Sequence, residues 1–325
     1  MKRWLAIEDL VEELNGSVVT LGNFDGMHLG HQAIVRETIQ RSKKLKLPSV
    51  LITFDPHPAK VLGYEPPPLL TTPPQRGDLL EGTGLDHFVI WPFTRETAAM
   101  RAREFVERCL WKRLMMKHLC IGPTTHVGRA REGTPEKLAE YARSLGFGLT
   151  VVPAVRAGRS VISSSRVREI IQRGKVGEMP KSLGRFYETT GRVVRGDGRG
   201  RGMGFPTANL GPVETLLPAN GVYATIIRLG EKRFAAATNI GTRPTVSVDG
   251  SVIVESHLLD LDSDVTGREL RIEWLSRLRA EKRFPSLGHL QRQVTRDCEA
   301  SREVTKGFLS KGGTKRSLLR AEMAK

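Results

Sequence analysis

Two histidines three residues apart, His28 and His31, are the first side chains along the chain whose types and spacing could serve chemistry. An apolar run at 17–21 predicts a buried strand before them. Apolar positions from 34 to 39 follow at helical spacing, so the pair falls where a strand turns into a helix. A helix N-terminus attracts phosphate through its unpaired N–H groups and partial positive charge. Imidazoles beside it could stabilise charge that develops on a phosphoryl group under attack. The pattern predicts a nucleotide site.

The neighbours of the histidines fit such a site, because glycines let the backbone approach a ligand closely. We expect the nucleotide to contact Gly22, Asn23, Phe24, Asp25 and Gly30. Two other interpretations remain open from the residues alone. The histidines could be partly exposed polar residues at a helix start. They could also be two ligands of a zinc ion, but no nearby Cys or His has the spacing for a complete zinc site.

The ten residues 22–31 resemble the His-x-Gly-His signature of nucleotidyltransferases, in the form found in bacterial FAD synthetases. Class I aminoacyl-tRNA synthetases carry a related His-x-Gly-His element. This motif alone therefore leaves two enzyme classes open.

A second polar cluster, 163–168, begins another predicted helix. Serines are good N-caps, which would explain one of them structurally. Arg166 and Arg168 in the first turn oppose the helix dipole and so indicate an anionic ligand. The string resembles the Ile-Ser-Ser-Thr-x-Ile-Arg element of the same FAD synthetase family, which lies across the phosphates from His-x-Gly-His. This resemblance implies phosphate contacts by Ser164, Ser165 and Arg168, with Ser165 in place of the usual threonine.

A glycine-rich basic loop at 200–210 runs into Pro206-Thr207-Ala208-Asn209. Hydroxyl and amide oxygens are hard ligands that suit Mg²⁺. The loop closely resembles the Gly-Arg-x-x-Gly-Phe-Pro-Thr-Ala-Asn-Leu signature of riboflavin kinases. The resemblance implies that Thr207 and Asn209 hold Mg²⁺ against the phosphates of ATP. It also implies nucleotide contacts by Gly200, Arg201, Gly204 and Pro206.

Strand-like alternation at 251–259 places Glu255 and His257 on one face with Ile253 and Leu259. An acid on a largely apolar strand face is either hydrogen-bonded structure or a site residue. The resemblance places Glu255 at the catalytic base of riboflavin kinases. Two further segments, 217–224 and 238–245, agree with that family in order and spacing, and the second contributes Arg243 as a cofactor contact.

The elements that must position these residues fall into two patterns. In the first half, strand-like runs alternate with helices, which indicates a parallel α/β sheet. We expect strands at 49–54, 86–91, 118–121 and 149–152, a long helix at 97–116, and a helix that Thr134 caps. After a link at 178–184, short alternating runs indicate an antiparallel barrel. We expect strands at 190–194, 222–229, 234–239, 251–259 and 270–275, and a helix at 286–304.

Taken together, the resemblance covers about residues 17–300 and is to the bifunctional bacterial riboflavin kinase/FAD synthetase. It implies an α/β Rossmann-like nucleotidyltransferase domain followed by an antiparallel six-stranded β-barrel. The expected divisions are an FMN adenylyltransferase domain at 1–178, a riboflavin kinase domain at 183–310 and a basic tail at 311–325. The aminoacyl-tRNA synthetase interpretation fails, because no tRNA ligase carries that second half.

The implied enzyme phosphorylates riboflavin with ATP to FMN, then adenylylates FMN with a second ATP to FAD and pyrophosphate. Its catalytic residues would be Glu255, His28, His31 and Arg168. One alternative is a riboflavin kinase whose first domain is weakened or inactive in adenylylation. Another is a flavin- or nucleic-acid-binding regulator without turnover, against which the intact Glu255, Thr207 and Asn209 argue.

One segment departs from the family. After the fourth strand the family has Gly-x-Asp-Phe or Gly-x-Asn-Phe, whereas this chain has Thr124 and Thr125 in place of the acid or amide and the aromatic residue. In the family these two side chains lie by the flavin and phosphates of the adenylylation site. We therefore expect adenylylation to work but to be slow.

Composition limits the number of domains, the kinds of partner and the location of the protein. A length of 325 residues suits two domains, and a net charge of +16 calls for anionic partners such as ATP. The basic residues are scattered with few aromatics among them, which argues against specific nucleic-acid binding. No apolar run approaches the roughly 18–20 residues that span a bilayer, and there is no signal-peptide core. Three unpaired cysteines predict a cytoplasmic protein with reduced thiols. The sequence does not indicate an oligomeric state.

Overall fold

The computed structural model describes residues 1–309 except 197–198, 203 and 243–251. The chain divides after Ser164 into two compact units. No helix among the described residues is long and apolar enough to cross a lipid bilayer. The predicted tail at 311–325 lies outside the described residues, and the predicted domain boundaries remain predictions.

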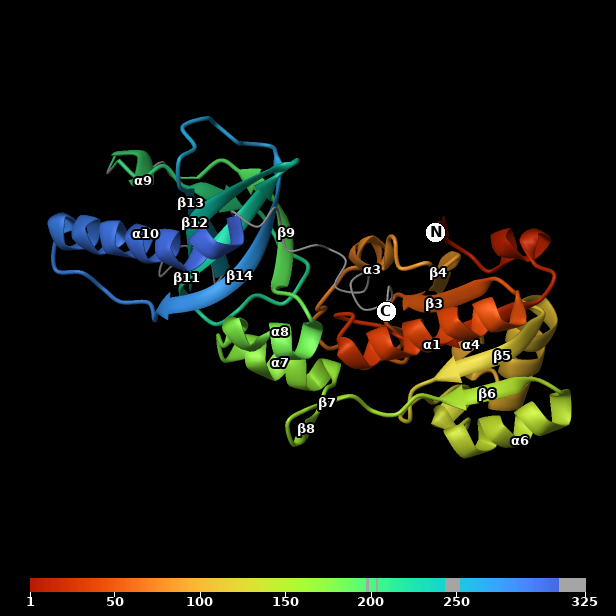
Figure 1. The fold of residues 1–325 in the computed structure, drawn as a ribbon. Coiled ribbons are helices and arrows are strands. Elements are labelled where there is room, and N and C mark those ends of the chain that lie inside the picture. The colour runs from red at the N-terminus through yellow and green to blue at the C-terminus, as the bar shows by residue number, and fades with distance from the viewer. Residues whose placement is uncertain (197–198, 203, 243–251, 310–325) are drawn as a thin grey trace. The chain divides into compact units, whose positions relative to one another are not determined.

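The first unit is a six-stranded sheet whose neighbouring strands all run parallel, in the order β1-β4-β3-β2-β5-β6 (Figure 1). This confirms the predicted Rossmann-like architecture. Its strands are β1 (Lys2–Trp4), β2 (Ser17–Leu21), β3 (Ser49–Asp55), β4 (His87–Pro92), β5 (Met116–Ile121) and β6 (Gly148–Val151). The short, exposed β1 is absent from the sequence prediction, because three residues carry no readable alternation.

The helices of the first unit include α1 (Leu29–Leu45), α2 (Pro58–Val61), α3 (Pro73–Leu80) and α6 (Pro135–Leu145). Short helical turns lie at η1 (Glu8–Glu13) and η3 (Arg129–Arg131), and a small hairpin joins β7 (Arg156–Ala157) to β8 (Ser160–Val161). Strand β2 lies between β3 and β5 and is buried throughout. The chain runs from β2 toward β3 on one side and reaches β5 on the other. Open parallel sheets bind ligands at the carboxyl ends of strands around such a point.

The predicted single helix at 97–116 is wrong. The segment forms α4 (Arg95–Ala99), α5 (Ala102–Glu104) and a π-helical stretch, η2 (Phe105–Arg113), with Met100 and Arg101 extended between α4 and α5. The break has a local cause. The Glu132 carboxylate accepts a hydrogen bond from the Ala102 N–H at 2.8 Å and so fixes the start of the second helix. Apolar spacing alone does not reveal this partner thirty residues away.

The second unit contains a closed antiparallel barrel in the order β10-β13-β12-β11-β14-β9, which confirms the predicted six-stranded barrel. Its strands are β9 (Tyr187–Val194), β10 (Ala208–Leu210), β11 (Gly221–Leu229), β12 (Lys232–Thr242), β13 (Val252–Leu258) and β14 (Glu269–Arg279). Strand β10 was not predicted, because three residues after a proline carry too little pattern. Helix α10 (Leu287–Leu309) packs on the barrel through Cys298, against Ala235 and Ala237.

Four shorter helices complete this unit: α7 (Ser164–Gln172), η4 (Val176–Glu178), α8 (Pro180–Leu183) and α9 (Arg199–Gly202). Ser164, the first residue of α7, belongs to the first unit, and the rest of α7 is grouped with the second. The predicted link at 178–184 contains α8 and ends at Gly184 in the left-handed conformation, which suits a glycine.

Candidate active sites

The turn after β2 is tightly wound. Gly22 extends the strand pairing by donating its N–H to the Ile52 carbonyl at 3.1 Å. Phe24, Gly26 and Met27 then adopt left-handed backbone conformations, with φ of 48°, 82° and 43°. Glycine takes such a φ without steric cost, whereas Phe24 and Met27 need compensation, which their buried side chains supply. The turn is thus fixed by the core beneath it.

The predicted histidine pair lies at the start of α1. His28 is the N-cap, and its Nδ1 accepts a hydrogen bond from the His31 N–H at 3.2 Å. The two rings stack with centroids 3.6 Å apart and 18° between their planes. His28 is only 7% exposed, so the interpretation as exposed polar residues is wrong for it. Within the described part of the chain, no group of three or more His, Cys, Asp or Glu side chains is placed to hold a metal ion such as zinc.

The hydrogen bonds and surroundings of the two rings indicate which nitrogens can act on a ligand. Because Nδ1 of His28 accepts a hydrogen bond, a neutral His28 carries its proton on Nε2 and can donate it. Burial, with His28 and Arg76 nearby, holds the pKa of His31 well below its usual range. In the described structure, Nδ1 of His31 is buried without a hydrogen-bond partner. Such an atom needs a partner from outside the protein, and a phosphate group or water could supply one.

The His28 ring can lie close to the backbone of α1 because residue 30 is a glycine and has no Cβ. A Cβ added there would lie 3.0 Å from Cε1 and 3.1 Å from Nδ1 of His28. Both separations are tighter than ordinary contacts, so a larger residue would disturb the ring. Its predicted contact with the nucleotide is untested by this geometry.

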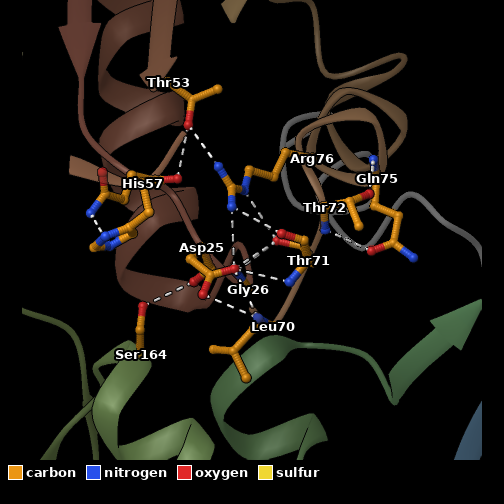
Figure 2. Close-up of polar contacts among 11 residues, drawn as sticks. Asp25, Gly26, Thr53, His57, Leu70, Thr71, Thr72, Gln75, Arg76 and Ser164 are labelled. Carbon is orange, nitrogen blue, oxygen red and sulfur yellow. Dashed lines mark hydrogen bonds and ion pairs between the residues drawn. The ribbon is translucent and has the colours of Figure 1, made fainter. Parts of the chain in front are cut away.

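The Asp25 carboxylate forms several hydrogen bonds and an ion pair with other residues of the protein. Its carboxylate accepts hydrogen bonds from the N–H groups of Leu70 and Thr71 at 2.9–3.1 Å and from the Thr71 hydroxyl at 3.2 Å. It also forms an ion pair with Arg76 at 3.5 Å, in which both side chains are 3% exposed. Figure 2 shows these contacts converging on one carboxylate. Asp25 therefore ties the turn after β2 to the loop before α3, whatever else it contacts.

The predicted serine cluster reaches the same turn through Ser164, whose hydroxyl donates to the Asp25 carbonyl at 2.9 Å (Figure 2). Ser165 is exposed and Arg168 is half-buried on α7, and both belong to the second unit. Their place opposite the histidines remains a prediction.

The departure at Thr124 and Thr125 forms a small turn after β5. The Thr125 hydroxyl accepts a hydrogen bond from the Gly122 N–H at 3.1 Å, and the Thr125 N–H donates to the Gly122 carbonyl at 3.2 Å. Thr124 is exposed. The hydroxyl of Thr125 therefore stabilises this turn by a hydrogen bond within it.

In the barrel, strand register brings three polar residues into a row. Glu255 on β13 lies directly opposite Asn209 on β10 and opposite Asn239 on β12. Direct partners on neighbouring antiparallel strands project to the same face. The alternation predicted around Glu255 holds, because Val254, Ser256 and Leu258 are buried while Glu255 and His257 are half-buried. The candidate base is thus flanked by an amide on each side.

The loop before β10 is held beside this row. His257 Nδ1 lies 2.7 Å from the Pro206 carbonyl, which can only accept, so the ring donates to it. The Phe205 ring meets the same imidazole edge-on, with centroids 5.6 Å apart. A Cβ on Gly200 would lie 2.4 Å from the Phe205 carbonyl and 3.2 Å from the Thr207 hydroxyl, and one on Gly196 only 2.2 Å from the Asn209 amide. These glycines are required for the loop to close over Thr207 and Asn209.

A cavity of about 480 Å³ opens at this loop and includes Thr207 and Asn209 in its wall. Asn209 is buried, whereas Pro206, Thr207 and Gly204 are exposed. Residues of the β13–β14 connection, Leu261, Ser263, Asp264, Val265 and Thr266, line the other side. Two neutral oxygen ligands beside a cavity fit Mg²⁺, which keeps several waters and binds substrate phosphates rather than a complete protein cage.

Gly200 and Arg201 lie in the turn of α9, before Gly204. Arg243 lies outside the described residues.

Sequence reasoning missed Asn239, His57 and Arg76 as parts of these sites. Only the strand register reveals Asn239. His57 follows a strand at the same carboxyl edge as the histidine turn, a signal that was available, whereas nothing in the sequence indicates that Arg76 is buried.

Comparison with known proteins gives a consistent picture for both halves. Residues 10–166 match the family model described as FAD synthetase, and residues 183–305 match the one described as riboflavin kinase. A bifunctional riboflavin kinase/FMN adenylyltransferase of Escherichia coli K12 is 36% identical over 290 residues, covering 89% of this chain and 92% of that protein. The enzyme of the same name from Pseudomonas fluorescens is 32% identical over 298 residues, covering 92% and 96%.

A solved structure with a similar fold covers 93% of this chain and 98% of its own, with a TM-score of 0.82 and 29% identity. It is described as a macrolide-efflux protein from Streptococcus pneumoniae. This likeness concerns the fold, whereas the sequence relatives carry the family assignment.

Proposed function

Because the chain belongs to the family of bifunctional riboflavin kinase/FMN adenylyltransferases, we propose that its two polar sites perform successive reactions on one flavin. The chain is an ATP-dependent enzyme with both activities. It phosphorylates riboflavin to FMN, then joins FMN to the AMP part of a second ATP to give FAD and pyrophosphate. The alternative of a kinase without adenylylation has no support, since the first half matches the FAD synthetase family.

Glu255 is the proposed general base of the kinase step. It accepts the proton of the ribityl 5′-hydroxyl as that oxygen attacks the γ-phosphorus of ATP, and ADP leaves. Its place between Asn209 and Asn239 supports this role, because amides on both sides can orient the carboxylate. Base catalysis of this kind contributes roughly 10²–10⁴-fold.

Thr207 and Asn209 would hold Mg²⁺ in the same site, where it supplies charge neutralisation on the phosphates of ATP. The His257–Pro206 hydrogen bond supports their positions. Gly200, Arg201, Gly204, Pro206 and Arg243 are the proposed contacts to the nucleotide. They are assigned from the match to the riboflavin kinase signature.

His28 and His31 are the proposed catalytic residues of the adenylylation step. A phosphate oxygen of FMN attacks the α-phosphorus of ATP, and the bond to pyrophosphate breaks without a protein nucleophile. Imidazole N–H groups at a helix start can donate to the charge that spreads over the α- and β-phosphates. Arg168, Ser164 and Ser165 would complement this charge, and Gly22, Asn23, Phe24, Asp25 and Gly30 would form the surrounding turn.

The remaining assignments follow from the same premise. We assign residues 1–178 to adenylylation, 183–310 to the kinase and 311–325 to a basic tail, in a cytoplasmic enzyme. The observation that carries the proposal is that the histidine turn and the row around Glu255 lie in separate compact units, each with its own phosphate-suited loop.

A time course tests the overall function. Purified protein is incubated with riboflavin, ATP and Mg²⁺, and riboflavin, FMN and FAD are resolved by chromatography. FMN should appear first and FAD after it. Accumulation of FMN without FAD would mean that the protein has only the kinase activity. The absence of any turnover would favour a flavin-binding regulator.

A further inference from the structure

Two loops from adjacent strands meet at the carboxyl edge of the parallel sheet. Asn23 follows β2 by two residues, and His57 follows β3 by two residues. Their side chains are in contact, with 2.9 Å between Nδ2 of the Asn23 amide and Nε2 of His57. Figure 2 draws the His57 ring together with the Asp25 and Arg76 network.

The hydrogen bonds of His57 determine which ring nitrogen carries the proton. The Ala59 backbone N–H lies 3.2 Å from Nδ1, and His57 is the N-cap of α2. A backbone N–H can only donate, so Nδ1 must present its lone pair. In the neutral ring the proton is then on Nε2. The group that faces Asn23 is therefore a donor.

This donor determines the orientation of the Asn23 amide. The oxygen and nitrogen ends of an amide have nearly the same shape, so hydrogen-bond partners must decide between them. With Nδ2 facing this N–H, two donors would oppose each other, so we assign the two ends of the amide the other way round, with the oxygen toward His57. Its NH₂ group then points away from His57. Within the described residues, the other end of this half-buried amide has no protein hydrogen bond, so it is available to a ligand.

The backbone of Asn23 is fixed independently of His57. The Thr53 hydroxyl donates to the Asn23 carbonyl at 2.9 Å, and the buried Arg76 guanidinium donates to that hydroxyl at 3.0 Å (Figure 2). A change at His57 should therefore alter the side-chain orientation of Asn23 and leave the turn in place.

We propose that His57 is a positioning residue of the adenylylation site, which holds the Asn23 NH₂ group toward the phosphates of the nucleotide. The proposal rests on the proposed function of this turn. In the opposite orientation the amide would present its oxygen to an anion. A preorganised donor of this kind is worth about 10²–10³-fold in kcat.

A matched pair of substitutions, His57→Gln and His57→Glu, tests this role. Both side chains can reach the position of ring Nε2, and both change the contact with Ala59. The glutamine amide can donate to the Asn23 oxygen and keep the orientation. The glutamate carboxylate can only accept, so it draws the Asn23 NH₂ group away from the nucleotide. At saturating FMN and ATP, FAD formation by His57→Glu should be about 100-fold slower than by His57→Gln.

The same pair is then made in an Asn23→Ala background, which separates orientation from charge. If His57 acts through Asn23, the two double variants should form FAD at rates within about threefold of each other. Phosphorylation of riboflavin, which belongs to the second unit, should be unchanged in all of them, and thermal unfolding followed by circular dichroism checks that the first unit of each variant is folded.

Two results would overturn the positioning role. One is equal FAD formation by His57→Gln and His57→Glu. The other is a 100-fold difference that persists in the Asn23→Ala background, which would assign it to the added charge. Failure of the unsubstituted protein to make FAD from FMN is a different result, because it would refute the proposed adenylylation itself.

Discussion

Glu255 and Asn209 are direct partners across β13 and β10, so the candidate base and a candidate metal ligand project from the same face of the barrel. The residues are 46 positions apart in the sequence, and only the strand register brings them together. The loop that carries Pro206 and Thr207 is attached to the same strand by His257, two residues beyond Glu255.

His257→Phe tests that attachment. Phenylalanine preserves the aromatic contact with Phe205 but removes the hydrogen bond to the Pro206 carbonyl. One such bond is worth about 0.5–1.5 kcal/mol, so riboflavin phosphorylation should fall by roughly 2–10-fold. Adenylylation of supplied FMN should not change. An unaltered kinase rate would mean that the loop holds its position without His257.

Asp25→Ala tests the buried ion pair beneath the histidine turn. It leaves the Arg76 guanidinium buried without its carboxylate, which should lower the free energy of unfolding by about 3–5 kcal/mol. Lys137→Ala is the control, since it breaks an exposed pair with Glu140 in the same unit and should cost less than about 1 kcal/mol. Equal losses in denaturant titrations would show that burial of the Asp25–Arg76 pair is unimportant.

The lowered pKa of His31 predicts a pH dependence of stability. Below pH 6.5, the ordinary histidine pKa, His31 binds a proton in the unfolded chain but stays unprotonated in the folded protein, because folding lowers its pKa. Stability from this group is therefore present above pH 6.5 and falls with decreasing pH, by up to about 1.4 kcal/mol per pH unit. His31→Gln should flatten this part of the profile between pH 6.5 and 5. A profile that is unchanged by the substitution would contradict a buried neutral His31.

Thr124→Asp with Thr125→Phe restores the pair that the family carries after β5. One lost polar contact at a transition state costs roughly 3–4 kcal/mol, about a hundredfold to a thousandfold in rate. The restored protein should form FAD faster from saturating FMN, with the kinase step unchanged. The new Phe also removes the hydrogen bond between the Thr125 hydroxyl and Gly122, so thermal unfolding is measured alongside. No gain in rate would mean that this turn does not limit adenylylation.

The parts of the fold that the sequence predicts are those with long, regular patterns. Strand β2 was predicted with its observed bounds, because five buried positions run directly into a glycine-rich turn. The antiparallel barrel was predicted from the clear alternation of five strands, whereas the expectation of six strands came from the resemblance, since β10 itself was not predicted. The helix at 97–116 was wrong, since Glu132, distant in sequence, caps a second helix at Ala102.

The candidate site residues likewise divide into those that local sequence patterns indicate and those that depend on contacts between distant segments. His28 and His31 were proposed from residue type and local spacing, whereas Glu255 was left undecided by the alternation and was proposed as the base from the resemblance. Asn239 and Arg76 were not, because their roles depend on register and burial, which arise only when distant segments pack. Asp25 was expected to face a nucleotide, yet its carboxylate binds Leu70, Thr71 and Arg76. Residue type indicated its importance, and only tertiary contacts show these partners.

The central claim is that the two activities belong to separate sites, and two variants test it in one assay. Rates of FMN formation from riboflavin and of FAD formation from supplied FMN are measured for Glu255→Gln and for His28→Ala with His31→Ala. Glu255→Gln should lower the first rate by roughly 10²–10⁴-fold and leave the second unchanged. The double histidine variant should do the reverse. Loss of both activities in a folded Glu255→Gln protein, or FAD formation at the parent rate without the histidines, would contradict the account.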